Sequence, residues 1–194
     1  DDHFGMPVEL GYDPYTVALY QSSHGGQSPP TNINDPEWVQ WRADNVTQLM
    51  GHIVEAVHQI KPDCHISLSP NPQPFARDKF LQDWEQWQQL GFIDDLIIQV
   101  YRGSIESFVN ELERPRLQAL KGTLPISIGI LTGLRNQPTN NHLIAQQVQA
   151  VRDRTFSGVS FFFYESLGNR DDFFHSLFPT SVVGFHVKTN PNKR

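Results

Sequence analysis

The chain has 194 residues and is 38% hydrophobic, with 13 Phe and 4 Trp, a composition that argues against intrinsic disorder. Its 15 basic and 21 acidic residues give a formal net charge of −6, which argues against nucleic acid or an anionic membrane surface as the main partner. The single cysteine, Cys64, excludes an internal disulfide and a multi-cysteine metal site, and no apolar run approaches the ~20 residues that span a bilayer.

The first predicted helix follows a polar stretch, residues 21–34, that is typical of a surface loop. Asp35-Pro36 supplies the capping residue and the proline with which helices often begin. Pro62 is expected to end this helix. Apolar residues recur behind the cap at helical spacing and predict one buried stripe: Val46, Leu49, Met50, Ile53, Val57 and Ile60.

Strands and further helices are expected to alternate over the rest of the chain. Four segments rich in β-branched or aromatic residues predict strands: 64–69, 95–101, 125–131 and 158–164. The segments between and after them predict helices: 78–90, 105–120 with an interruption near Pro115, 141–152 and 171–178. Apolar strands separated by helices are typical of an α/β fold with a parallel sheet covered on both faces. An open doubly wound sheet and part of a (β/α)8 barrel both fit this order.

Polar side chains follow each predicted strand, and in both candidate folds this carboxyl edge of the sheet is where ligands bind. They are Asp1 and Asp2, Ser69 and Asn71, Gln99 and Tyr101, Thr132, and Glu165. Their convergence predicts a functional site at that rim.

Carboxylates at this rim favour glycosidic cleavage, which requires two of them on opposite sides of one cleft. Successive strand residues point to opposite faces, so either Asp1 or Asp2 is expected to face the cleft directly; both are alternatively solvated terminal residues. Glu165 follows a strongly hydrophobic strand, and low-dielectric surroundings would suit it to act as a general acid. The alternative for Glu165 is a rim carboxylate paired with Arg170.

The start of the first predicted helix carries further candidates. Trp41 is placed either to stack on a sugar face or to pack at the helix start, and Arg42 is placed to pair with Asp1 or Asp2. His52 and His58 are six residues apart and do not form a zinc motif. An Asp-Asp-His sequence is also found in metal-dependent deacetylases, but the chain has no H-x-x-x-H pair. We therefore expect no metal and no cofactor.

Several short motifs, in this order along the chain, resemble the glycosyl-hydrolase-like 10 family of bacterial (β/α)8 glycosidases from Asp1 to about Asn169. They are DDHF at 1–4, WRADNV at 41–46, ISLSPNP at 66–72, D-W-x-x-W at 83–87, G-x-I-D at 91–94, IIQVY at 97–101, ISIGI at 126–130 and GVSFFFYESL at 158–167. The resemblance implies the C-terminal half of a TIM barrel, from the end of strand 4 to strand 8.

The same resemblance assigns roles to individual positions. Asp1 and Asp2 fall on the catalytic acids at the end of strand 4, and His3 stands where the family usually has tyrosine. The positions expected to line the cleft are Arg42, Asn45, Asn71, Gln99 and Tyr101, and we add His3 and Trp41 as candidate substrate contacts. The implied substrate is a bacterial envelope polysaccharide, such as a peptidoglycan glycan strand, and the implied location is the periplasm or the cell exterior.

We therefore expect a glycoside hydrolase that works by carboxylate acid/base catalysis. The alternatives are a carbohydrate-binding barrel without turnover and a metal-dependent polysaccharide deacetylase. A complete barrel needs ~250 residues, so residues 1–179 are expected to form a partial barrel domain and 180–194 a tail. The N-terminal half is expected from the same parent chain, and this chain alone is expected to be inactive or unstable.

Overall fold

The computed structural model describes residues 4–134 and 137–180. Within them, a parallel sheet is formed by β1 (Ser67–Leu68), β2 (Asp95–Gln99), β3 (Ile126–Leu131) and β6 (Gly158–Phe162). The strands lie side by side in sequence order, β1-β2-β3-β6, and each neighbouring pair is parallel. A doubly wound sheet reverses its strand order at one point, and these described strands show no such reversal. The α/β class and the parallel sheet predicted from the sequence are confirmed.

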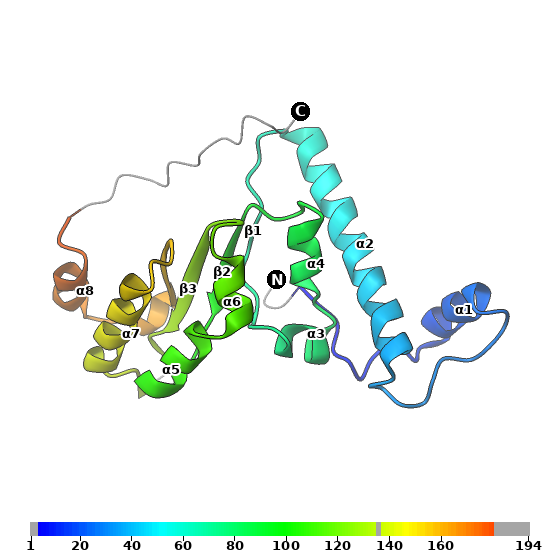
Figure 1. Cartoon of the computed structure of the whole chain (residues 1–194), viewed down its shortest axis with the longest axis horizontal. Helices are drawn as coiled ribbons and strands as arrows, with labels where there is room; N and C mark the ends of the chain where they lie inside the picture. Colours follow the sequence, from blue (N-terminus) through cyan, green and yellow to red (C-terminus); the bar gives the residue numbers. More distant parts are fainter. Residues whose placement is uncertain (1–3, 135–136, 181–194) are drawn as a thin grey trace.

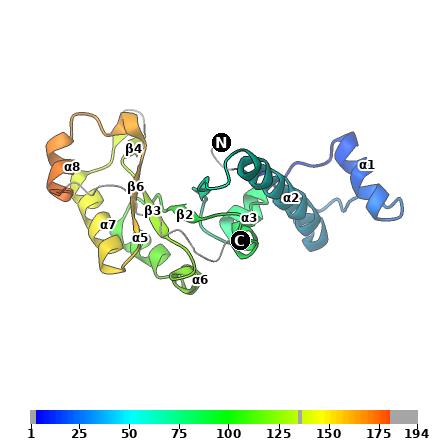
Figure 2. The same ribbon diagram turned by 90° about the horizontal axis from the view of Figure 1, so that it is seen from above.

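Helices cover one face of this sheet. The connections after β2 and β3 contain α5 (Ile105–Leu112), α6 (Pro115–Leu120) and α7 (Asn141–Asp153), and α8 (Asp171–Leu177) follows β6. Figure 2 shows α5, α6 and α7 on the same side of the strands. The side chains of β2 and β3 that point toward them are fully buried: Leu96, Ile98, Ile126, Ile128 and Ile130. They form the centre of the hydrophobic core with Phe108 of α5 and Val148 of α7.

The opposite face of the sheet, which we call the open face, contains Ser67, Ile97, Gln99, Gly129, Ser160 and Phe162. Ser67, Ser160 and Phe162 are exposed, and Ile97 and Gln99 are half-buried. The expectation of a sheet covered on both faces is therefore wrong for the described residues. The reason is the alternation within the strands, because this side has the small or polar Ser67, Gln99, Gly129 and Ser160 beside Ile97 and Phe162, whereas the residues of β2 and β3 that face the helices are aliphatic.

Beyond the sheet, α2 (Pro36–Ile60) is the longest helix of the described chain, and α1 (Pro14–Ser23) lies on its far side from the strands (Figure 1). Asp35 caps α2 as predicted, since its carboxylate accepts from the backbone N–H groups of Glu37 and Trp38. The same Asp-Pro signal begins α1 at Asp13-Pro14, a helix the sequence analysis missed. A small antiparallel pair, β4 (Gly133–Leu134) with β5 (Gln137–Pro138), was also missed.

The buried face of α2 differs from the predicted stripe. Leu49, Ile53 and Ile60 are 53%, 38% and 88% exposed, whereas Met50 is buried. The buried positions are instead Trp38, Val39, Arg42, Ala43, Thr47, Met50 and Val54. This face meets α4 (Trp84–Gln89), where the Trp87 indole N–H donates to the Thr47 hydroxyl at 2.8 Å. Leu49, Ile53 and Ile60 thus form an exposed apolar side of α2.

The single helix predicted over 78–90 is two helices, α3 (Phe75–Phe80) and α4. Leu81 ends α3 in the left-handed region at φ 54°, and its side chain is fully buried. Asp83 then caps α4 through its carboxylate. The strand predicted at 64–69 is also shorter than expected, since β1 contains two residues. The predicted interruption near Pro115 is confirmed as the break between α5 and α6.

Candidate functional site

The carboxyl ends of β1 and β2 bring Asn71, Gln99 and Tyr101 to one edge of the sheet, as the sequence predicts. The Gln99 side-chain amide donates to the main-chain carbonyl of Ser69 at 2.7 Å, which ties the two strand ends together. The Trp84 indole N–H donates to the Asn71 carbonyl at 3.0 Å and holds the segment after β1 against α4. All three candidate side chains are half-buried, so part of each can be reached from solvent.

Tyr101 and Phe162 form an aromatic pair at this edge. Their ring centroids are 5.4 Å apart and their planes differ by 22°, although β3 lies between the strands that carry them. The Tyr101 ring lies over Gly129 of β3, where a Cβ atom would be in ordinary contact with its Cε1 at 3.5 Å. Tyr101 was predicted from the sequence as a site residue, whereas Phe162 was predicted only as part of the strand over 158–164.

A buried hydroxyl network fixes the chain after β6. The backbone N–H and the side-chain hydroxyl of Thr132 both donate to the Phe162 carbonyl, at 2.8 and 3.0 Å. The Thr132 and Ser166 hydroxyls are 2.7 Å apart. Arg170 donates to the carbonyls of Thr132 and Ser166, so its guanidinium is engaged by main-chain oxygens. The end of β6 and the segment behind it are therefore held by several hydrogen bonds to buried groups.

Glu165 lies at the rim but is exposed, in the short 3-10 helix η1 (Tyr164–Ser166). The expected low-dielectric setting of its carboxyl is therefore wrong. The strand before it is strongly hydrophobic, but Glu165 is three residues beyond the end of β6 and turns out of the core with η1. The described contacts of Arg170 are with carbonyls and Asn141, and the alternative pairing of Glu165 with Arg170 is not among them.

Asp1, Asp2 and His3 lie outside the described residues. The segment that directly follows them is anchored beside α3 and α4. The Phe4 ring meets Trp87 edge-on at 5.6 Å, and the backbone N–H groups of Met6 and Val8 donate to the carbonyls of Phe80 and Lys79 at 2.8 and 2.9 Å.

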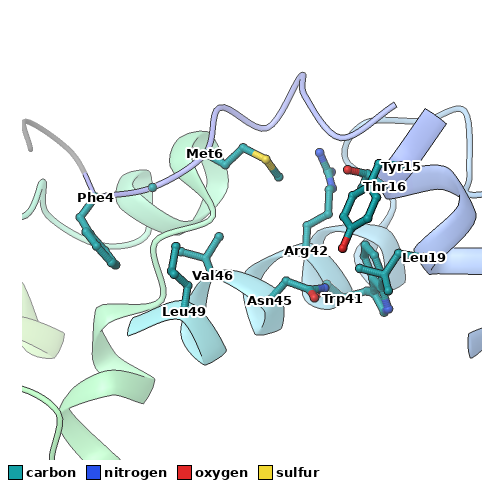
Figure 3. A pocket seen from close by; sticks show the side chains of 11 residues that line it. Phe4, Met6, Tyr15, Thr16, Leu19, Trp41, Arg42, Asn45, Val46 and Leu49 are labelled. Carbon is teal, nitrogen blue, oxygen red and sulfur yellow. The ribbon is translucent and has the colours of Figure 1, made fainter. Parts of the chain in front are cut away.

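A cavity of about 380 Å³ lies between this anchored segment, α1 and α2 (Figure 3). Three of the predicted substrate contacts line it, Trp41, Arg42 and Asn45. The rest of its wall is mainly apolar: Phe4, Gly5, Met6, Tyr15, Thr16, Leu19, Val46 and Leu49. The predicted site residues are thus brought together as two groups, one around this cavity and one at the carboxyl ends of β1 and β2.

Arg42 is almost entirely buried, with 1% of its surface exposed, and binds the main chain. Its guanidinium donates to the carbonyls of Val8, Leu10 and Ile33, and Nε donates to the Trp38 carbonyl. The guanidinium carbon also lies 4.5 Å from the centre of the Trp38 ring. Burial lowers the pKa of Arg42. These contacts give Arg42 the role of holding the loop before α2. The expected pairing with Asp1 or Asp2 involves residues that lie outside the described chain and stays a prediction.

Trp41 belongs to an aromatic cluster on the outer side of α2. Its ring stacks on Trp38 at 5.3 Å and meets Tyr20 edge-on at 5.2 Å. His24 stacks on Tyr20 at 3.8 Å, and Glu37 accepts hydrogen bonds from the Tyr20 hydroxyl and from His24 Nε2 at 2.5 and 2.9 Å. The packing alternative for Trp41 is therefore the one that its described contacts support.

The Tyr20–Glu37 hydrogen bond makes the stability of the fold depend on pH in the alkaline range. The Glu37 carboxylate and, secondarily, burial raise the pKa of Tyr20 to about 12. Because the pKa of Tyr20 is higher in the folded state than the ~10 of an unfolded tyrosine, the hydrogen bond contributes fully to the free energy of unfolding below pH ~10. This contribution is lost as the pH rises toward 12. We expect Tyr20→Phe to remove the last step of tyrosinate absorption at high pH; an unchanged absorption titration in that variant would contradict the assignment.

Two kinds of feature are absent from residues 4–134 and 137–180. No group of three or more His, Cys, Asp or Glu side chains in this part of the chain is arranged to hold a metal ion. No helix found there has the length and apolar character needed to cross a membrane.

Comparisons with known proteins agree on the fold. A family model described as glycosyl hydrolase-like 10 matches residues 1–151. Among solved structures, the chain is similar to the glycoside hydrolase domain of PgaB (BpsB) from Bordetella bronchiseptica, with a TM-score of 0.63 and 12% sequence identity. The match covers 93% of this chain and 55% of that one, so this chain spans about half the length of the domain it resembles. No curated protein matches the chain.

Proposed function

Because the chain belongs to the glycosyl hydrolase-like 10 family, we propose that the protein is a glycoside hydrolase that cleaves a polysaccharide. The observation that carries the proposal is the arrangement at the carboxyl edge of the sheet. There the Gln99 amide and the Tyr101 phenol lie at the end of β2, the exposed Phe162 ring lies at the end of β6, and Glu165 follows three residues after β6. Stacking surfaces and polar groups of this kind are suited to bind a sugar ring.

We further propose that β1, β2, β3 and β6 are strands 5 to 8 of a (β/α)8 barrel. Three observations support this proposal: the sequential parallel order, the helices on one face, and the open face opposite them. In a barrel the open face would point to the interior. The two edge strands of the described sheet, β1 and β6, would then pair with strands of the N-terminal half. A glycoside hydrolase domain of nearly twice this length shares the fold.

The uncovered side of α2 fits the same proposal. Leu49 and Ile53 are exposed, and Leu49 lines the apolar cavity beside the segment that follows Asp1 and Asp2. The N-terminal half of the barrel, contributed by the same parent chain, would cover these side chains and fill the cavity. Trp41 and Asn45 would then lie at the junction of the two halves, near the mouth of the barrel.

Replacing Leu49 and Ile53 together by glutamine tests this arrangement. In the chain of 194 residues the change is expected to leave the free energy of unfolding nearly unchanged, because both side chains are already exposed. In the full-length gene product it is expected to lower that free energy by about 3 kcal/mol, since two apolar side chains would lose their burial. Urea denaturation of both proteins measures the difference, with Leu90→Gln as the control, because Leu90 directly follows α4 and is 51% exposed. Equal effects in both would contradict the proposal.

The proposed reaction uses two carboxylates. One of Asp1 and Asp2 stabilises or attacks the oxocarbenium-like centre, and the other carboxylate at the rim, Glu165, protonates the leaving oxygen. Gln99, Tyr101 and Asn71 hydrogen-bond the sugar at the point of cleavage, and His3 is proposed as a further substrate contact. A separation of ~5–5.5 Å between the carboxyl groups would give retention of configuration at the sugar carbon, and ~6.5–9.5 Å would give inversion.

Release of new reducing ends from a polysaccharide tests this function. The full-length gene product is incubated with denuded peptidoglycan glycan strands and with chitooligosaccharides, and reducing ends and acetate are measured with and without a chelator. We expect reducing ends to appear whether or not the chelator is present. Binding without cleavage would instead indicate a carbohydrate-binding protein, and acetate release that the chelator abolishes would indicate a deacetylase.

A further inference from the structure

Arg102 is held at both its side chain and its main chain. It directly follows Tyr101, just beyond the end of β2. Its Nη2 atom donates to the carboxylate of Glu111, in α5, at 2.8 Å. Its carbonyl accepts from the side-chain amide of Gln147, in α7, at 2.9 Å. Two helices on the same side of the sheet (Figure 2) therefore fix the chain next to one of the candidate substrate contacts.

The two side chains that hold Arg102 are buried, since Gln147 is 1% and Glu111 is 4% exposed. The Glu111 carboxylate also pairs with Nε of Arg114 at 2.9 Å. One buried acid thus joins the chain before α5 to the chain between α5 and α6. Displacement of either segment is unfavourable, because it would leave a buried charge incompletely paired.

Gln147 is unusual for its position in α7. The buried residues around it on this helix are apolar, among them Ile144, Val148 and Val151. Its side-chain oxygen has no hydrogen-bond partner within residues 4–134 and 137–180, and an unpaired buried polar atom lowers stability. A methionine of similar size would avoid this cost, but it could not donate to the Arg102 carbonyl. Such departures from local packing rules are typical of residues that serve function.

The orientation of Tyr101 depends on this fixed segment, because Tyr101 lies beyond the last residue of β2. On one side of it the sheet still holds the chain, since the Val100 N–H donates to the Gly129 carbonyl at 3.0 Å. On its other side the chain is held at Arg102 by the two helices. A rotation of the main chain at Arg102 would therefore move the phenol, which is at the far end of a long side chain.

We infer that Gln147 and Glu111 are positioning residues of the proposed saccharide site, which hold Tyr101 through Arg102 in the orientation that binds the sugar. The inference rests on the proposed function for the ligand of Tyr101 and adds to it the two buried residues that fix this side chain. Their effect on cleavage passes through Tyr101, and this distinguishes positioning from a contribution to folding alone.

Gln147→Met tests the inference in the full-length gene product. The change removes both the donor and the unpaired oxygen, so the urea midpoint is expected to stay the same or to rise. In contrast, kcat/KM for the polysaccharide is expected to fall by about tenfold, because a contact to the sugar is misplaced. Gln149→Met makes the same change at an exposed residue of α7 and is expected to alter neither quantity.

A double variant separates positioning from an independent structural effect. Tyr101→Phe removes the hydroxyl that the proposed site uses. Addition of Gln147→Met is then expected to cause no further loss of kcat/KM, because the group that Gln147 positions is already absent. Losses that multiply would overturn the inference. Glu111→Gln is expected to behave as Gln147→Met does in this cycle, with Glu113→Gln, at an exposed residue directly after α5, as its control.

The orientation of Tyr101 can also be measured without any reaction. When 3-fluorotyrosine replaces Tyr101, its fluorine resonance is expected to be displaced by the ring current of Phe162, whose ring centroid lies 5.4 Å away. Gln147→Met is expected to move this resonance toward the value of an exposed tyrosine. An unchanged resonance would overturn the inference and leave hydrolysis standing. A shifted resonance in a protein that releases no reducing ends would support the positioning of Tyr101 and overturn hydrolysis.

Discussion

Replacement of both Asp1 and Asp2 by asparagine is expected to lower the rate of polysaccharide cleavage by about 10³-fold or more. Asparagine has nearly the shape of aspartate but carries no charge, so it can neither attack the sugar carbon nor stabilise a developing positive charge there. The two residues directly precede the segment that Phe4 and Met6 anchor beside α3 and α4. The substitutions are therefore expected to change kcat much more than stability.

Single variants divide the roles of the carboxylates. Since neighbouring strand residues point in opposite directions, one of Asp1→Asn and Asp2→Asn is expected to account for most of the loss. Glu165→Gln is expected to remove the limb of the pH–rate profile that reports the general acid. Asp63→Asn, at an exposed residue before β1, serves as the control. A double variant with more than half of the original rate would contradict the assignment of Asp1 and Asp2.

Arg42→Met is expected to lower the free energy of unfolding by about 3–5 kcal/mol, a large share of the total for a domain of this size. Methionine keeps an apolar side chain in the space of the arginine stem but removes its donors. The carbonyls of Val8, Leu10 and Ile33 then lose a charged hydrogen-bond partner. Because those residues lie in the loop that carries α1, the loop is expected to loosen first.

Urea denaturation and limited proteolysis measure the effect of Arg42→Met. Arg42→Lys is expected to restore part of the stability, because a single ammonium group cannot reach several carbonyls at once as a planar guanidinium does. Arg152→Met is the matched control. The Arg152 side chain is exposed and donates to one main-chain carbonyl, that of Leu177, at 2.7 Å, so its loss is expected to cost ~1 kcal/mol or less. A loss below ~1 kcal/mol in Arg42→Met would show that the buried contacts do not hold the loop.

Several elements could be predicted from local signals. The aliphatic runs of β2 and β3 and the Asp-Pro cap of α2 predicted these elements within a few residues, because those signals depend on neighbours in the sequence. The break at Leu81 could not be predicted in this way. Leu81 adopts a left-handed backbone conformation with a fully buried side chain, and packing among Val8, Val39 and Ala43 favours that arrangement.

The two faces of α2 show a second limit. Apolar residues at helical spacing predicted a buried stripe, but Leu49, Ile53 and Ile60 are exposed. Periodicity identifies an apolar side of a helix, and it does not identify which neighbour covers that side. The proposed N-terminal half of the barrel supplies that neighbour.

In the candidate site, the sequence predicted the strand ends but not the function of each side chain. Gln99 and Tyr101 lie at the carboxyl edge as expected, because parallel strands end at one edge. Arg42 also binds main-chain carbonyls of Val8, Leu10 and Ile33, contacts that no side-chain pattern in the sequence indicates. Phe162 became a candidate only when the strand order placed it against Tyr101 across Gly129.

A crystal structure of the full-length protein with a bound oligosaccharide tests the central claim most directly. The claim is that the saccharide site lies at the carboxyl edge of the parallel sheet. It predicts a sugar ring at the ends of these strands, with Gln99 and Tyr101 within hydrogen-bond distance and the carboxylate of Asp1 or Asp2 beside the bond to be cleaved. A saccharide bound instead in the cavity between α1 and α2, lined by Leu19, Trp41 and Leu49, would contradict it.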